Sequence, residues 1–252
     1  MKGLQILKFN KSALSSSIRS ISTSQTFNNK KNVAIVLSGC GIYDGSEVLE
    51  TTSAMIHLSK NDANCSLFAP NIEQFHVINH LTGQVSPETR NVLEESARIA
   101  RGNIQALEKL KASDYHALVF PGGFGAAKNL SNYATQGTKM TVDKEIERVV
   151  DEFIVASKPI GFICISPVLA AKLIPGVELT EGKRDQKNWP YAEAIENIAL
   201  MGAKPIEKDT PEVHIDYKFK VISTPAFMKH SATPVEVFDG IGNLISNLLR
   251  LI

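Results

Sequence analysis

The chain has 252 residues, of which 43% are hydrophobic and 21% are charged, and its formal net charge is +1. This composition fits one large α/β domain and excludes a collagen-like or mostly disordered protein. The near-neutral charge gives no reason to expect nucleic acid as a partner. Three scattered cysteines are too few for a disulfide framework, so a reducing compartment is expected.

The first 31 residues have the composition of a mitochondrial or plastid transit peptide. They contain six basic residues, no acidic residue and a serine-rich stretch over residues 12–24. A secretory signal would need an unbroken apolar core, which the short run over residues 4–9 does not supply because Lys8 interrupts it. The alternative is a basic tail without a targeting role. We predict a transit peptide over residues 1–31 and a single domain over residues 32–252.

Short apolar runs alternate with helical patterns through the rest of the chain. The predicted strands cover residues 33–37, 64–69, 116–120 and 159–163, and the predicted helices cover residues 46–60, 90–111, 142–157 and 166–173. Ser46 is expected to cap the first helix. Residues 213–223 suggest a hairpin, and residues 234–252 a closing helix that covers the sheet or a dimer interface. This alternation predicts a mainly parallel sheet with helices on both faces, and no apolar run is long enough to span a membrane.

Cys164 lies where a buried strand must turn sharply into a helix, which is the position of a nucleophile elbow. The amides and the dipole at the start of the next helix would favour a thiolate there. A buried structural cysteine is the alternative. Since ligands of parallel sheets bind beyond the carboxyl ends of the strands, the loops that end the neighbouring strands bear on the choice.

A glycine-rich loop follows the strand over residues 116–120. Gly122 and Gly123 allow backbone amides to approach a substrate oxygen, as an oxyanion hole requires. The same loop begins like a dinucleotide fingerprint, but Lys128 stands in the place of its third glycine, and no phosphate-binding loop of the Walker type occurs. A nucleotide site is therefore rejected.

Glu47 opens the helix after the first strand and could reach Cys164 as a general acid or base, although a glutamate in a first turn also suits the helix dipole. Asp44 and Glu50 are residues of the same kind with weaker claims. His80 lies in an irregular segment and could line the site. Ile165, not histidine, follows the cysteine, so nothing local supports a Cys-His-acid hydrolase. No paired ligands predict a metal.

Several longer segments resemble the PfpI-like superfamily, which has the class I glutamine amidotransferase-like fold and includes the DJ-one deglycases. Within it the chain is most similar to the ElbB branch and its mitochondrial relatives, the ES-one proteins. The matching segments span most of residues 33–230 and cover residues 38–47, 68–70, 77–83, 88–93, 121–130, 161–164 and 224–226.

The resemblance implies a flavodoxin-like three-layer sandwich, a homodimer and a mitochondrial matrix location. It implies that Cys164 is the elbow thiol, that Glu47 is its acidic partner, and that Gly122, Gly123 and Ile165 frame the oxyanion pocket. The remaining candidates for lining the site are Cys40, His80 and Asn129.

ElbB-like proteins are described as glyoxalases that need no cofactor, so the resemblance implies conversion of glyoxal or methylglyoxal to a 2-hydroxy acid. Ile165 replaces the histidine that follows the cysteine in PfpI-like proteases, which argues against proteolysis. The histidine that DJ-one relatives place beside the cysteine has no counterpart in residues 181–191. The alternative function is a redox-sensing or binding protein that keeps the scaffold, with Cys164 pairing with Cys40 on oxidation.

Overall fold

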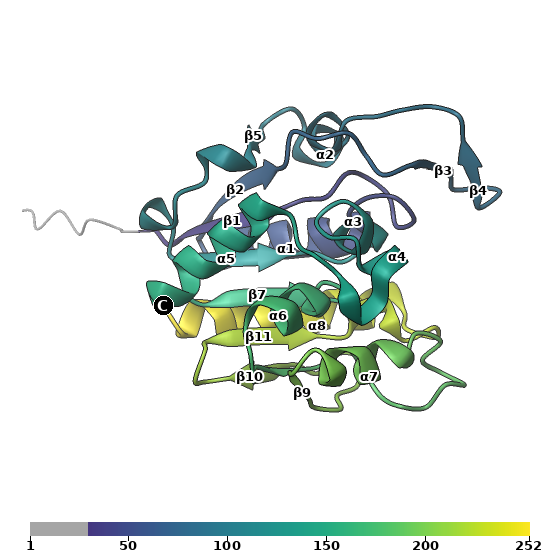
Figure 1. Ribbon diagram of the computed structural model, residues 1–252. Helices are drawn as coiled ribbons and strands as arrows, with labels where there is room; N and C mark the ends of the chain where they lie inside the picture. The colour runs from purple at the N-terminus through teal and green to yellow at the C-terminus, as the bar shows by residue number, and fades with distance from the viewer. Residues whose placement is uncertain (1–29) are drawn as a thin grey trace, which may run out of the picture.

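A computed structural model describes residues 30–252 (Figure 1), so nearly all of the predicted transit peptide lies outside the described residues. The central sheet has seven strands in the order β10-β11-β7-β6-β1-β2-β5. All neighbours are parallel except β10 and β11, which pair as the predicted antiparallel hairpin. The strands are β1 (Asn32–Val36), β2 (Asn64–Ala69), β5 (Gln105–Ala106), β6 (Ala117–Phe120), β7 (Ile160–Ile163), β10 (His214–Asp216) and β11 (Val221–Thr224).

Helices cover both faces of this sheet. The helices α1 and α8 pack against each other on one face, and α5 and α6 lie on the other (Figure 1). None of the helices in residues 30–252 is long and apolar enough to cross a bilayer. The α-helices are α1 (Val48–Lys60), α2 (Val92–Ala100), α3 (Phe124–Lys128), α4 (Tyr133–Gln136), α5 (Lys144–Val155), α6 (Pro167–Leu173), α7 (Glu193–Leu200) and α8 (Pro234–Arg250).

Several short elements lie outside the central sheet. Two small two-stranded sheets pair β3 with β4 and β8 with β9, and the β3–β4 hairpin extends from the body of the molecule (Figure 1). Within residues 30–252, four single-turn 3₁₀ helices connect larger elements. The bounds are β3 (Val77–Asn79), β4 (Gln84–Ser86), β8 (Glu178–Leu179), β9 (Lys204–Pro205), η1 (Leu107–Lys109), η2 (Ala112–Asp114), η3 (Gly137–Lys139) and η4 (Ala226–Met228).

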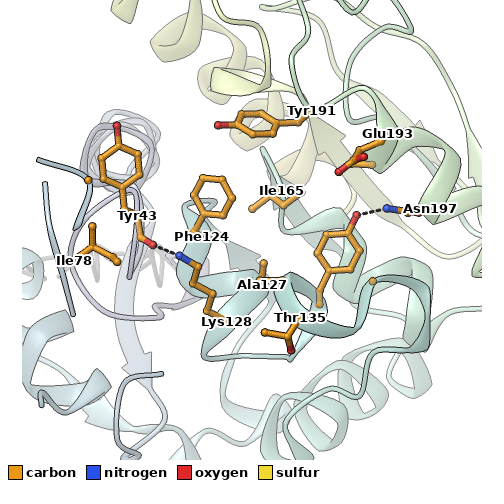
Figure 2. A pocket seen from close by; sticks show the side chains of 15 residues that line it. Tyr43, Ile78, Phe124, Ala127, Lys128, Thr135, Ile165, Tyr191, Glu193 and Asn197 are labelled. Carbon is orange, nitrogen blue, oxygen red and sulfur yellow. Dashed lines mark hydrogen bonds between the residues drawn. The ribbon is translucent and has the colours of Figure 1, made fainter. Parts of the chain in front are cut away.

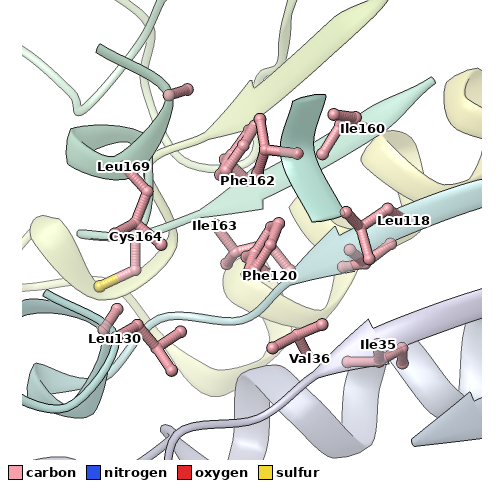
Figure 3. Packing of buried hydrophobic residues seen from close by; sticks show 14 of the residues in the cluster. Ile35, Val36, Leu118, Phe120, Leu130, Ile160, Phe162, Ile163, Cys164 and Leu169 are labelled. Carbon is pink, nitrogen blue, oxygen red and sulfur yellow. The ribbon is translucent and has the colours of Figure 1, made fainter. Parts of the chain in front are cut away.

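The core lies between the central strands and the helices, and it ends at the predicted elbow. Every residue of β6 and β7 is buried, as expected for strands covered on both faces. Figure 3 shows Phe120 and Phe162 side by side on these strands, with ring centroids 5.2 Å apart and planes inclined by 7°. Cys164 follows directly, and its sulfur points away from these rings (Figure 3). The packed centre of the sheet therefore holds the start of the elbow rigidly.

The predicted strands agree with the observed ones, but the helix predicted over residues 90–111 is wrong in its second half. The helix α2 ends at Ala100 because Arg101 and Gly102 both adopt the left-handed conformation. Ile104 and Leu107 continue the apolar spacing, yet they belong to the connection through β5 and η1. Apolar spacing alone did not reveal this stop, since Arg at such a position is uncommon.

The closing helix α8 covers the sheet, as the sequence favoured. Its stripe of Val237, Ile241, Leu244 and Leu248 is fully buried within the chain. Its N-terminus carries a capping box, in which Thr233 and Glu236 satisfy each other's backbone amides. This apolar stripe therefore packs within the chain and is not exposed for a dimer interface.

Candidate active site

Cys164 is the elbow residue between β7 and α6. Its φ of +60° is in the left-handed region, which a side chain other than glycine adopts only where the surrounding structure enforces it. The Cys164 amide donates to the Thr224 carbonyl at 3.0 Å on the neighbouring strand β11. Strained conformations of this kind gather at active sites, and the predicted sharp turn from strand to helix at Cys164 is observed.

Ser166 stabilises the turn between β7 and α6 through its buried side chain. Its hydroxyl accepts a hydrogen bond from the Ile163 amide at 2.8 Å and lies 2.9 Å from the Phe120 carbonyl oxygen. The side chain is completely buried, so these bonds act without competition from water. Ser166 thereby ties the end of β7 to the end of β6, the two strands that deliver the thiol and the glycine-rich loop.

The carboxyl group beside the thiol belongs to Glu50 in the first turn of α1. Its side chain is fully buried and hydrogen-bonds the Cys164 thiol. Oxygen Oε2 also accepts a hydrogen bond from the Gly122 amide at 2.9 Å, and Oε1 lies 3.5 Å from the Phe227 amide nitrogen. Three donors from different loops therefore converge on this one carboxyl group.

The prediction that Glu47 is the acidic partner of the thiol is corrected by this geometry. Glu47 is the N-cap of α1, and its Oε2 accepts a hydrogen bond from the Glu50 amide at 2.6 Å. Ser46, the predicted cap, instead accepts from the Ser38 amide at 2.8 Å and closes the loop after β1. The helix thus starts one residue later than predicted, which turns Glu50 inward. The sequence feature that could have indicated this helix start is the spacing of three residues between Glu47 and Glu50, since a glutamate often stands three residues after an N-cap.

The glycine-rich loop packs against the thiol, but Gly122 does not have the oxyanion role that was predicted for it. The Gly122 amide is occupied by Glu50, so Gly122 does not serve as an oxyanion donor. A Cβ atom at Gly122 would lie 2.3 Å from the Cβ of Cys164, which explains why only glycine fits. The amides of Gly123 and Ile165 face the sulfur. These two amides are the backbone donors beside the thiol, in the arrangement that an oxyanion hole would need.

Burial dominates the electrostatics of the thiol–carboxyl pair. It raises the pKa of Glu50 to about 8, and the nearby Glu47 carboxylate adds to this rise. Burial and the charge of Glu50 also hold the pKa of Cys164 well above its usual value, while the Gly123 and Ile165 amides oppose that rise. Two buried acids in hydrogen-bond contact therefore keep their protons near neutral pH. A carboxyl with a pKa near 8 is ionised in a fraction of the molecules at neutral pH, and in its ionised form it can accept the proton of the thiol.

Asn129 and His80 organise the loops and do not line the cavity beside the thiol. Asn129 is buried, and its amide group donates to the carbonyls of Ser38 and Asp44 and accepts from the Phe75 amide, at 2.8 to 2.9 Å. The His80 ring accepts from the Tyr43 amide at 3.3 Å and contacts the Ile78 carbonyl at 3.0 Å.

Cys40 lies on the side of the loop that faces α2. Its pKa is raised by burial and by Glu95, and lowered by Arg98. None of these residues is among the groups that act on the Cys164 thiol. All three cysteines are free thiols. The structure thus gives Cys40 and Cys164 separate electrostatic surroundings.

A cavity of about 730 Å³ opens beside the elbow. Figure 2 shows Ile165 near its centre, with Phe124 beside it, Tyr191 above it and Lys128 on the wall nearest Tyr43. Residues 30–252 contain no group of three or more His, Cys, Asp or Glu side chains placed to bind a metal. The remaining lining residues are Ile78, Gly83, Ala127, Tyr133, Ala134, Thr135, Gly137, Glu193, Ala194 and Asn197.

The parallel sheet and the cysteine elbow define a class I glutamine amidotransferase-like α/β fold. The crystal structure of an isoprenoid biosynthesis protein with an amidotransferase-like domain from Ehrlichia chaffeensis superposes with a TM-score of 0.79 and 34% identity, covering 88% of this chain and all of that one. Crystal structures of a ThiJ/PfpI domain protein from Brachyspira murdochii and of Drosophila melanogaster DJ-1beta share the fold at 13% and 14% identity.

Two curated relatives identify the family. The chain is 51% identical to the human mitochondrial glutamine amidotransferase-like class 1 domain-containing protein 3, over 87% of this chain and 82% of the relative. It is 50% identical to the rat mitochondrial ES1 protein homolog, over 88% and 84%. No family model matches the chain. The chain belongs to the mitochondrial ES1 family, and its predicted mitochondrial location is confirmed.

Proposed function

We propose that the protein is a glyoxalase-like enzyme that converts 2-oxoaldehydes to 2-hydroxy acids through Cys164 and Glu50. The observation that carries this proposal is the buried contact between the thiol and the Glu50 carboxyl, beside the Gly123 and Ile165 amides that face the sulfur. A nucleophile and its base are thus already in hydrogen-bond contact.

The chemistry follows from these positions. Glu50 takes the thiol proton as the sulfur adds to the aldehyde carbon, and the resulting hemithioacetal oxygen lies near the Gly123 and Ile165 amides. Glu50 passes the thiol proton to that oxygen, which completes the hemithioacetal hydroxyl and leaves the carboxylate ionised again. Glu50 then removes the proton from the same carbon and returns it to the adjacent carbonyl carbon, while the hydroxyl proton moves to the adjacent oxygen, which leaves a 2-hydroxy thioester. Water hydrolyses the thioester, releasing the 2-hydroxy acid and regenerating the thiol. No net oxidation occurs, since one carbon is oxidised while its neighbour is reduced.

The same pair disfavours the alternative of redox sensing. Redox-sensor cysteines have a low pKa and are accessible to solvent. The Cys164 thiol has a raised pKa and is 9% exposed. Cys40, its suggested disulfide partner, has different electrostatic neighbours.

The proposal is tested by proton NMR of the purified protein with methylglyoxal. We expect lactate to form with the wild type and not with Cys164→Ala, which lacks the nucleophile. Equal signals from both proteins would contradict the proposal, because any lactate would then arise without the thiol. Circular dichroism of both proteins controls for folding.

A further inference from the structure

The cavity beside the elbow is lined by sequence neighbours of the proposed reacting groups. Two of its lining residues, Phe124 and Ile165, are direct neighbours in sequence of Gly123 and Cys164. Tyr191 also lines it, and the charge of Cys164 contributes, after burial, to raising the pKa of the Tyr191 hydroxyl. The cavity therefore lies next to the elbow, and Ile165 is the lining residue that directly follows Cys164.

The walls of this cavity are aromatic and fixed by hydrogen bonds. Phe124 and Tyr191 form an edge-to-face pair, with ring centroids 5.7 Å apart and planes at 78°. Lys128 donates to the Tyr43 carbonyl at 2.6 Å, which joins α3 to the loop after β1. The Tyr133 hydroxyl accepts from Asn197 at 2.9 Å, which joins α4 to α7 (Figure 2). The hydrogen bonds thus fix Lys128 and Tyr133, while Phe124 and Tyr191 contact each other.

The size of the cavity does not match the smallest 2-oxoaldehydes. Glyoxal or methylglyoxal fills roughly the space of two or three water molecules, each about 30 Å³ in the liquid. That is roughly a tenth of the cavity volume of about 730 Å³. A cavity of this size is typical of sites for larger organic ligands, which are lined mainly by apolar and aromatic groups.

We propose that this cavity binds an aromatic substituent on the carbonyl substrate, so that the preferred substrates are aryl 2-oxoaldehydes. This inference rests on the proposed function and adds the substrate class. A planar ring enters between Phe124 and Tyr191 on one side and Ile165 on the other, while the aldehyde carbon reaches the sulfur. Aromatic rings favour offset and edge-to-face neighbours, and the paired Phe124 and Tyr191 rings supply them.

The test compares phenylglyoxal with methylglyoxal as substrates of the full-length protein. The rates are measured as mandelate and lactate formed, after subtraction of the Cys164→Ala background, because phenylglyoxal also reacts with arginine. We expect kcat/KM for phenylglyoxal to exceed that for methylglyoxal by about tenfold or more. Tyr191→Ala should reduce this ratio severalfold, and Tyr191→Phe, which keeps the ring, should preserve it. Tyr217→Ala removes an exposed tyrosine outside the cavity and is the matched control.

The outcomes separate this inference from the proposed function. Turnover of both substrates without a phenylglyoxal preference would overturn the inference and leave the proposed function intact. If neither substrate is turned over, the proposed function fails. Binding of mandelate and lactate, measured by ligand-detected NMR, then tests whether the cavity binds an aromatic substituent. Tighter binding of mandelate that Tyr191→Ala weakens would support an aromatic-binding cavity, whereas equal binding of the two acids would overturn it.

Discussion

At the scale of single residues, the central finding is which carboxyl meets the thiol. Glu47 and Glu50 stand three residues apart at the start of α1, and the family resemblance implied Glu47 as the acidic partner. The structure uses Glu47 as the cap and Glu50 as the buried partner of Cys164. A shift of one residue in the helix start decides between them. Helix ends are where sequence patterns are least exact, since capping depends on the conformation of the preceding loop.

The raised pKa of Glu50 predicts the pH dependence of turnover. Glu50 must be ionised to take the thiol proton, and its folded-state pKa lies near 8. We therefore expect kcat/KM for methylglyoxal to rise about tenfold per pH unit below pH 8 and to level off above it. A pH series between 6 and 9.5 at constant ionic strength measures this. A profile that is flat or falls over that range would contradict the assignment of Glu50 as the base.

Gly122 is expected to be irreplaceable for activity. A methyl group there would lie 2.3 Å from the Cβ of Cys164 and 2.5 Å from Oε2 of Glu50, so Gly122→Ala must push the pair apart. We expect about 100-fold lower kcat/KM and a loss of about 1–3 kcal/mol of unfolding free energy. Kinetics and urea unfolding measure the two effects. The control is Gly242→Ala, where the added methyl group is crowded by His57 at the contact between α1 and α8. This variant should be destabilised but keep the kcat/KM of the wild type, because Gly122 is unchanged.

At the scale of secondary-structure elements, the strands were the most predictable part of the chain. The apolar runs of β1, β2, β6 and β7 are short, continuous and bounded by turn residues, and the observed bounds agree within about one residue. The short α3, α4 and α7 and the β8–β9 pair were not predicted. They have too few turns for a periodic pattern, and packing around the cavity holds them in place. The wall of the candidate site was thus the hardest region to infer.

Glu181, which follows β8, is expected to lower stability. It is 2% exposed, and neither carboxylate oxygen has a hydrogen-bond partner among residues 30–252. Burial raises its pKa well above the ordinary value of 4.5. Because the unfolded chain releases this proton more readily, the destabilisation grows as the pH rises above about 4.5. Glu181→Met should therefore add about 1–3 kcal/mol near neutral pH, and less in acid.

Thermal unfolding between pH 5 and 9 measures this effect. Glu178→Gln is the matched control, since Glu178 lies three residues earlier on β8, is partly exposed and contacts His214 at 3.1 Å. The interpretation would be contradicted if Glu181→Met melted below the wild type throughout this pH range. Such a result would mean that the carboxylate is used in the folded state.

At the scale of the whole molecule, the sheet brings together groups that are far apart in the sequence. Glu50, Gly122 and Cys164 come from the loops and helix starts after β1, β6 and β7, which are neighbours in the sheet. The predicted parallel order was enough to place these strand ends at one edge. It did not settle which atoms meet, because contacts of 2 to 3 Å depend on the exact start of α1 and on loop conformations. The homodimer expected from the family resemblance stays a prediction, which light scattering would test.

The central claim is that Glu50, and not Glu47, works with Cys164 as the acid–base group. The most direct measurement is kcat/KM for methylglyoxal with Glu50→Gln and Glu47→Gln, each checked by circular dichroism for an intact fold. The account predicts a loss of at least about 100-fold for Glu50→Gln. It predicts a change of only a few fold for Glu47→Gln, because glutamine still offers an oxygen to the amide that Glu47 caps. The reverse order, or equal activity of Glu50→Gln and wild type, would contradict the account.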